Sequence, residues 1–285
     1  MVYFCADDYG MSAKGNSRIE DCIKNGLLNK VSVLPNGELS DFNRYLSRSG
    51  AQLSLHINLV EGRPLSNPKD ISLLISKDGY FKYSFAGLFL LSLSPKRKEL
   101  EKQIYREIKS QIEFWKETAG EKASYSLDSH QHTHIIPLVF KTLMRVIYDE
   151  GMEIQSIRVP AEPISPYLFT PSLYFSYTPI GLIKQWLLKI LAFVNRKELK
   201  KSKIKSSYFF GVMFSGNLNE TVIKKLLPRY LKLSEKYNRD IEIGFHPGYI
   251  KKEEALICGS RKSFGKFYYS PKRKTEYDTL LKLKF

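Results

Sequence analysis

The stretch VYFCADDYGMSAKGNSRIEDCIKNGLLNKVSVLP, residues 2–35, joins two short apolar runs through a helix-like segment. The first run, VYFCA, ends at Asp7 and Asp8. Between Ser12 and Leu28 the apolar side chains recur at the spacing of an amphipathic helix, and KVSVLP is the second apolar run. This order predicts two strands joined by a helix, which is the repeating unit of an α/β protein.

The same alternation continues along the chain. AQLSLHINLVEG, residues 51–62, alternates apolar and polar side chains as a half-buried strand does. Further strands are expected at residues 123–130, 153–160, 206–216 and 240–248, and helices at 41–50, 95–118, 137–150 and 219–237. Repeated strand–helix units favour a parallel sheet or a barrel. The final LLKLKF is expected to be a last barrel strand, complete or incomplete.

The size and composition of the chain indicate a folded protein. With 285 residues and 43% hydrophobic side chains, one α/β domain with an insertion fits, and so do two small domains. Three scattered cysteines make no disulfide framework and are expected to be buried or idle thiols in a reducing compartment. The N-terminus lacks the pattern of a secretory signal, so the expected location is cytoplasmic.

The formal net charge of +16 allows attraction to nucleic acid, anionic lipid or an acidic glycan. Much of the excess lies in short runs such as PKRKEL, NRKELKKSKIK and SPKRK, which are typical of a solvated lysine-rich surface. The sequence has no helix-turn-helix, zinc-finger or ribonucleoprotein signature. Nucleic acid is therefore not an expected partner.

Residues 162–205 interrupt the alternation with a proline- and aromatic-rich stretch followed by IGLIKQWLLKILAFVNRK. Lys184, Gln185 and Lys189 break the apolar run, which is too short for a transmembrane span. Its apolar positions suit an amphipathic helix. Three roles are open: packing on the core or in a homodimer, covering a substrate as a lid, or contacting a membrane interface.

Polar side chains lie at the ends or on the polar faces of the expected strands, where parallel α/β folds gather functional groups. They are Asp7, Asp8, His56, Asp128, His130 and His246. Carboxylate and imidazole ligands with open positions suit a hydrolytic Zn²⁺ or Mg²⁺, with Mn²⁺ or Co²⁺ as alternatives. Asp7 and Asp8 can divide the work, because one carboxylate binds the metal while the other accepts a proton from water.

The stretch LDSHQHTH, residues 127–134, is the strongest single signal of a site. It places histidines at 130, 132 and 134. On an extended segment these alternate positions would put all three imidazoles on one side. This pattern predicts metal binding or catalysis. We expect His130 to supply one ligand and Asp128 to orient a ligand. His134 is the better candidate to line the pocket or support His130, and the role of His132 is open.

Four motifs, in this order, resemble those of the YdjC-like carbohydrate deacetylases, which include the chitooligosaccharide deacetylases. They are ADDYG, LHINLVEGRP, LDSHQHTH and FHPGY, and they span residues 6–249. The resemblance implies a single TIM-barrel-like (β/α) domain over residues 1–285, with residues 162–205 as an insertion. It also implies a metal-dependent hydrolase that removes an acetyl group from an N-acetylated sugar.

The same resemblance implies a role for each matching residue. Asp8, His56 and His130 are the implied metal ligands. Asp7 is the implied general base, and His246 the implied acid or stabiliser of the tetrahedral intermediate. Further residues are expected to bind substrate or support the ligands; they are Glu61, Asp128, His134, Arg158, Pro247 and Gly248.

Two other classes of function stay open from the sequence. One is a metal-dependent esterase or phosphoesterase that uses the same site. The other is a non-catalytic basic protein that binds glycan or nucleic acid. For the deacetylase, the expected substrate is an N-acetylated sugar or oligosaccharide, free or linked to a lipid or nucleotide, and a location peripheral to the membrane is an alternative to a purely cytoplasmic one.

Overall fold

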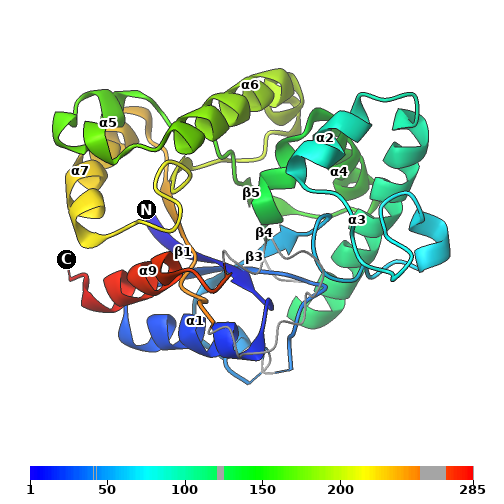
Figure 1. Cartoon of the computed structure of the whole chain (residues 1–285), viewed down its shortest axis with the longest axis horizontal. Helices are drawn as coiled ribbons and strands as arrows, with labels where there is room; N and C mark the ends of the chain where they lie inside the picture. Colours follow the sequence, from blue (N-terminus) through cyan, green and yellow to red (C-terminus); the bar gives the residue numbers. More distant parts are fainter. Residues whose placement is uncertain (41, 43, 121–124, 251–267, 285) are drawn as a thin grey trace.

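Seven parallel strands form one curled sheet in the described part of the chain (Figure 1). The computed structural model describes residues 1–40, 42, 44–120, 125–250 and 268–284. The strands are β1 (Val2–Tyr9), β2 (Lys30–Val33), β3 (Gln52–Ile57), β4 (Tyr125–Ser129), β5 (Ile154–Ile157), β6 (Tyr208–Phe210) and β7 (Ile241–Phe245). Their order is β5-β4-β3-β2-β1-β7-β6. The arrangement is a distorted TIM-like barrel, which confirms the predicted fold class.

The two edge strands approach each other without forming a continuous ladder. An isolated parallel bridge pairs Ser156 of β5 with Lys205, just before β6. The backbone N–H of Ile157 donates to the carbonyl of Lys205 at 2.9 Å. The strand expected at residues 206–216 is shorter in the structure, because only Tyr208 to Phe210 pair with β7.

Helices cover the sheet on the outside, and most lie where the periodicity predicts them. The α-helices are α1 (Ala13–Asn25), α2 (Phe85–Ser92), α3 (Arg97–Ala119), α4 (Pro137–Asp149), α5 (Ser165–Leu168), α6 (Pro179–Ser202), α7 (Glu220–Tyr237) and α9 (Pro271–Lys282). The 3-10 helices are η1 (Leu46–Arg48), η2 (Pro68–Ile71), η3 (His130–Ile135) and η4 (Pro171–Ser176). Helix α3 buries the predicted face, including Leu100, Ile104 and Trp115.

Local signals explain where these helices begin. Ser12 caps α1 because its Oγ accepts the backbone N–H of Gly15 at 3.0 Å. Pro137 begins α4 without costing a hydrogen bond, since the first-turn N–H groups of a helix have no partner within it. Pro228 lies inside α7 without ending it.

Two predictions about local structure were wrong. Residues 41–50 do not form a helix: their described part contains only η1, and positions 41 and 43 lie outside the described residues. The described part of the final LLKLKF, residues 280–284, is not a strand either, because α9 continues through Lys282 and packs on α1; Phe285 lies outside the described residues. Cys5 and Cys22 are free and buried as predicted, and Cys258 lies outside the described residues.

Candidate metal centre

At the end of β1 two consecutive carboxylates, those of Asp7 and Asp8, face the same pocket. On a regular strand Asp7 and Asp8 would point to opposite faces. The pairing of β1 with β2 is irregular between Ala6 and Tyr9, and Asp8 adopts a left-handed φ of 71°. Both carboxylates are buried and both line the same pocket. This backbone costs about 1–3 kcal/mol for a residue other than glycine, and such costs are concentrated at functional sites.

His56 is fixed from behind by Asp128 on the neighbouring strand. The register of β3 and β4 places the two residues opposite each other, and His56 Nδ1 lies 2.7 Å from Asp128 Oδ1. His56 Nε2 then faces Asp8 Oδ1 at 3.6 Å. Burial acts to lower the pKa of His56, but the carboxylate of Asp128 outweighs it and raises the pKa to about 10. A carboxylate behind a histidine is the usual support of a metal-binding imidazole.

His130 lies between two further carboxylates. Its Nδ1 is 2.8 Å from Asp8 Oδ1, and its Nε2 is 3.1 Å from Glu61 Oε2. The hydroxyl of Tyr268 donates to the same Glu61 oxygen at 3.0 Å. Burial lowers the pKa of His130, but Asp8 and Glu61 outweigh burial and raise it to about 9.

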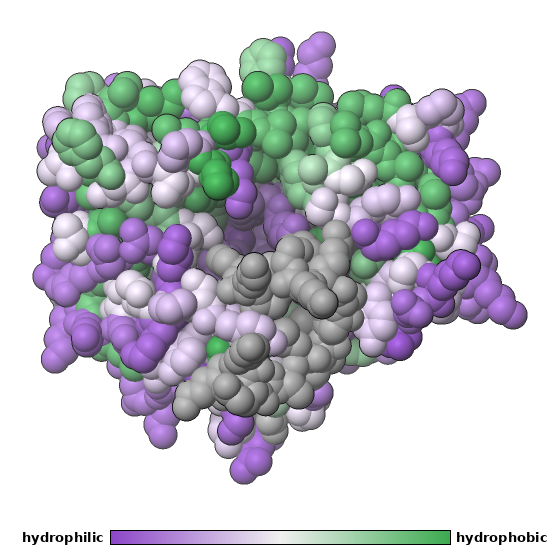
Figure 2. All heavy atoms as spheres, in the orientation of Figure 1, coloured by the Kyte–Doolittle hydropathy of each residue, from purple (hydrophilic) through white to green (hydrophobic). Residues whose placement is uncertain are grey.

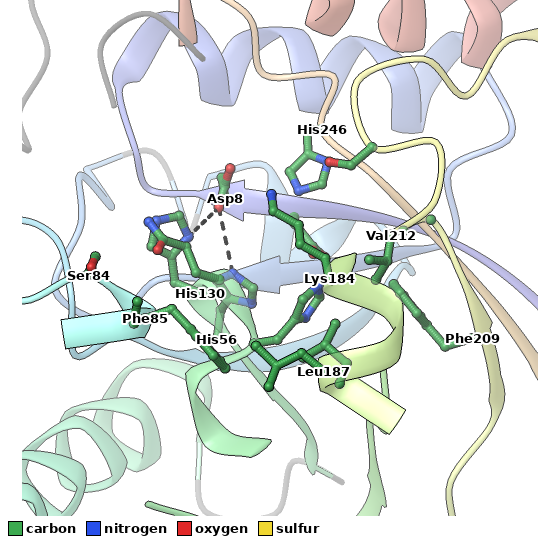
Figure 3. Close-up of a pocket in the computed structure, with 18 of the residues that line it drawn as sticks. Asp8, His56, Ser84, Phe85, His130, Lys184, Leu187, Phe209, Val212 and His246 are labelled. Carbon is green, nitrogen blue, oxygen red and sulfur yellow. Dashed lines mark hydrogen bonds and ion pairs between the residues drawn. The ribbon is translucent and has the colours of Figure 1, made fainter. Parts of the chain in front are cut away.

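Asp8, His56 and His130 together form a group that could hold a metal ion. One ligand atom from each residue lies within 4.8 Å of the other two. Figure 3 shows both imidazoles directed at the carboxylate of Asp8. Arg273 of α9 pairs with the other oxygen, Asp8 Oδ2. Oδ1 is therefore the oxygen that faces both imidazoles.

Two other acidic groupings among the described residues have comparable spacing. They are Cys5–Asp128–Glu242 and Asp7–His56–Asp128. A cation already lies among their carboxylates, because Arg158 contacts Asp7, Asp128 and Glu242 within 2.8 Å. The positive charge of Arg158 would repel a metal ion there, whereas Asp8 offers an oxygen between two imidazoles.

Arg158 also fixes Asp7. Its Nη1 donates to Asp7 Oδ2 at 2.6 Å and its Nη2 to Asp7 Oδ1 at 2.8 Å. Burial would raise the pKa of Asp7, but the guanidinium opposes it and the net shift is downward. Asp7 is therefore an ionised carboxylate at neutral pH, held in one orientation at the pocket wall.

The histidine-rich segment is not extended, so the expectation that its three imidazoles share one side was wrong. Residues 130–135 form η3, and Gln131 and His132 adopt left-handed φ angles of 53° and 58°. His132 lines the pocket and packs edge-on against Phe209, and burial lowers its pKa.

His134 does not line the pocket, which corrects the first part of its expected role. Its Nδ1 lies 2.6 Å from Ser129 Oγ, and its Nε2 lies 2.8 Å from the carbonyl of Arg158. Burial lowers its pKa to about 4, so it is neutral. His134 thus ties the end of β4 to the backbone of Arg158.

The motif after β7 contributes one residue to the pocket. His246 lines it, and its backbone N–H donates to Glu276 of α9 at 2.6 Å. Pro247 and Gly248 are not among the lining residues. Instead, Gly248 packs closely on Gly15: a Cβ there would lie 3.4 Å from the Gly15 carbonyl oxygen.

The pocket has a volume of about 520 Å³ and combines the carboxylates and imidazoles with apolar walls. Figure 3 shows Lys184 entering it from α6. Other lining side chains come from α2, α6, β6 and the residue after Gly211; they are Phe85, Leu187, Leu188, Phe209 and Val212. Its size lies in the usual range of small-molecule sites.

The sequence did not single out three residues of this site: Lys184, Tyr268 and Arg273. Arg273 belongs to the SPKRK run, which has the composition of a solvated surface, yet its side chain is fully buried against Asp8. The sequence feature that could have indicated Arg273 is its spacing from Glu276. Arg273 and Glu276 are three residues apart, and both lie on the face of α9 turned to the site.

Comparison with known proteins places this geometry in a family. The sequence pattern of the YdjC-like proteins matches residues 1–285. The chain belongs to the YdjC-like protein family. The predicted membership is thereby confirmed.

Proteins similar to this YdjC-like chain are known in sequence and in structure. A carbohydrate deacetylase of Danio rerio is 35% identical over 160 residues, which is 55% of this chain and 49% of that protein. The chain thus matches about half the length of that relative. A crystal structure from Enterococcus faecalis, described as a cellobiose-phosphate cleavage protein, has a TM-score of 0.62 at 14% identity, with 97% of this chain and 93% of that chain covered. This likeness supports the barrel-like fold.

Proposed function

We propose that the protein is a metal-dependent carbohydrate N-deacetylase, an amide hydrolase that releases acetate from an N-acetylated sugar. The convergence of Asp8, His56 and His130 beside the fixed carboxylate of Asp7 carries this proposal. The zebrafish relative supports the substrate class, since its name is carbohydrate deacetylase.

The donor set fits a divalent metal ion. Two imidazoles and one carboxylate are the ligands of many hydrolytic zinc sites, while Mg²⁺ prefers oxygen donors and water. Asp128 holds His56 Nδ1, so Nε2 is the nitrogen that His56 would offer. Because two of the three donors are imidazole nitrogens, Zn²⁺, Mn²⁺ or Co²⁺ fits this site better than Mg²⁺. When bound, such an ion polarises the acetamide carbonyl and lowers the pKa of a water molecule.

Asp7 is the proposed general base. Its carboxylate lines the pocket, is ionised, and is oriented by two hydrogen bonds from Arg158. A base must reach the proton it removes in a fixed geometry. Asp7 takes the proton of the attacking water while the new carbon–oxygen bond forms, and Arg158 acts as the residue that positions it.

His246 is the proposed general acid. It follows β7 and faces the pocket together with Asp8 (Figure 3), and Asp7 lines the same pocket. As the carbon–nitrogen bond of the tetrahedral intermediate breaks, His246 donates a proton to the departing sugar amine. Glu276 holds the backbone of His246 in place, because its carboxylate accepts the His246 N–H.

The test is a screen for acetate release. The purified protein is stripped with a chelator and then supplied with Zn²⁺, Mn²⁺, Co²⁺ or Mg²⁺ before it meets N-acetylated sugars, O-acetyl esters and phosphate esters. Metal-dependent acetate release from N-acetylated sugars supports the proposal. Exclusive release from O-acetyl esters, or phosphate release, would replace it with esterase or phosphoesterase activity.

A further inference from the structure

Helix α6 presents its apolar side chains outward. Its outer face consists of Ile180, Ile183, Trp186, Ile190, Phe193 and Val194, and each of these side chains is more than half exposed. These positions recur at three- and four-residue spacing and cover one broad side of the helix. A surface helix of a soluble protein ordinarily turns such a side inward.

The inner side of α6 carries two polar anchors beside the buried Leu188 and Leu191. Gln185 donates to the carbonyl of Glu162 at 3.0 Å, and Asn195 donates to the carbonyl of Ile135 at 2.7 Å. Both side chains are buried. These hydrogen bonds fix the rotation of α6 about its own axis. The fold itself therefore directs the apolar side of the helix outward.

The apolar surface extends from α6 onto its neighbours. Phe85 and Phe89 of α2 pack beside Leu188 and Leu191 of α6. Farther along the same segment Leu90 and Leu93 are 66% and 68% exposed. Figure 2 shows hydrophobic residues gathered over α6 and α2, above the hollow at the centre of that face. A continuous exposed patch of this kind marks an interaction surface.

The charges along α6 indicate which surface it meets. After its apolar stretch the helix has the exposed residues Arg196, Lys197, Lys200 and Lys201 against a single acid, Glu198. Apolar and aromatic residues followed by a basic cluster complement an anionic lipid surface. A second copy of the chain would bring the same basic cluster and the same net charge of +16 toward this face.

The same two helices form part of the pocket wall. Lys184, Leu187 and Leu188 of α6 line it, and so does Phe85 of α2. No helix in the described residues is long and apolar enough to cross a membrane. Because one side of α6 lines the pocket, the outer face of α6 lies within one helix diameter, about 10 Å, of that pocket.

We propose that the outer face of α6, together with Leu90 and Leu93, docks the protein onto an anionic membrane surface and presents the pocket to acetylated sugars carried on lipids. The docking stands on the exposed face and its charge alone. The lipid-carried substrate rests in addition on the proposed deacetylase function.

Vesicle flotation tests the docking without any turnover. The full chain should float with vesicles of phosphatidylcholine mixed with phosphatidylglycerol and bind vesicles of phosphatidylcholine alone more weakly, and added salt should weaken the binding. Trp186→Glu and Ile190→Glu should each weaken binding by about tenfold, because each puts a charge into the apolar contact. Neither residue lines the pocket.

Tyr237→Glu is the matched control. Tyr237 is 57% exposed, close to the 61% of Trp186, but it ends α7 at the amino end of β7, away from the pocket. This variant should bind vesicles like the wild type. Equal loss in the control and in Trp186→Glu, absence of flotation, or a dimer that Trp186→Glu dissociates without any vesicle binding would overturn the docking.

Turnover tests the second part. An N-acetylated sugar carried on an alkyl chain in the anionic vesicles should lose acetate faster than the free sugar, and Trp186→Glu should remove this advantage of about tenfold while leaving turnover of the free sugar unchanged. Equal rates on both substrates would exclude a lipid carrier. Flotation without any acetate release would instead keep the docking and reject the deacetylase function.

Discussion

The guanidinium of Arg158 meets the carboxylate of Asp7 end-on, through hydrogen bonds of 2.6 and 2.8 Å from Nη1 and Nη2. The same side chain contacts Asp128 Oδ2 at 2.8 Å and Glu242 Oε1 at 2.6 Å. One buried cation therefore joins the proposed base to the carboxylate that supports His56. This link couples the proton-transfer residue to the proposed metal ligands through fixed geometry.

Asp7→Asn should abolish most turnover while the metal stays bound. The amide keeps the shape of the side chain but accepts no proton, and a general base typically contributes about 10²–10⁴ in rate. Acetate release and metal content are measured on the same sample. Loss of the metal along with activity would show that Asp7 is a ligand rather than the base.

Arg158→Met should destabilise the fold by about 3–5 kcal/mol, because it removes the guanidinium that pairs with three buried carboxylates, of which Glu242 alone keeps a lysine partner, Lys30. Urea unfolding measures the loss. Arg158→Lys should recover part of the stability and little of the turnover, since lysine cannot make the two-bond contact with Asp7. Full turnover in Arg158→Lys would contradict the positioning role.

Stability of the metal-free protein should depend on pH through its buried aspartates and histidines. Asp7, Asp8 and Asp128 have lowered pKa values, so their contribution is present above the unfolded pKa, about 3.9, and is lost at lower pH. His56 and His130 have pKa values raised to about 10 and about 9. Their contribution is complete below about pH 6.5 and is lost as the pH rises through those values.

The unfolding free energy of the chelator-treated protein should therefore decline from about pH 6.5 upward. It should also decline below about pH 6.5, where the lowered pKa values of His132 and His134 favour the unfolded state, and further below about pH 4 as the aspartates gain protons. Urea unfolding across pH measures this profile. A flat profile between about pH 6.5 and 9 would show that neither imidazole is held protonated in the metal-free site.

Glu61→Gln should weaken metal affinity by about 10–100-fold, because Glu61 accepts from Tyr268 and contacts His130 Nε2. Titration with Zn²⁺ in a metal buffer measures this affinity. Glu113→Gln, at an exposed position of α3 that pairs only with Lys109 in the described contacts, is the control and should bind metal normally. Unchanged affinity in Glu61→Gln would remove Glu61 from the metal site.

Much of the architecture could be predicted from the sequence because periodicity reports burial directly. Leu100, Ile104 and Trp115 recur at helical spacing and form the buried face of α3. The carboxyl ends of parallel strands meet at one edge of the sheet, so Asp8 and His130 could be placed together although 122 residues separate them.

Other features depend on tertiary contacts that no local pattern reveals. The amphipathic pattern of α6 shows two faces but does not say which one meets the protein; Gln185 and Asn195 decide this through bonds to distant carbonyls. Arg273 lies in a run typical of a surface and is buried only because α9 returns over the site. Alternating histidines suggested an extended segment, but Gln131 and His132 turn it into η3.

The most direct test of the metal centre compares His130→Ala with His132→Ala. Both imidazoles line the pocket, but only His130 contacts Asp8. Metal content by elemental analysis and acetate release from an N-acetylated sugar are measured on each purified variant. We expect His130→Ala to lose both the metal and the activity and His132→Ala to keep its metal. Full metal content in His130→Ala would contradict the assignment of Asp8, His56 and His130 as the ligands.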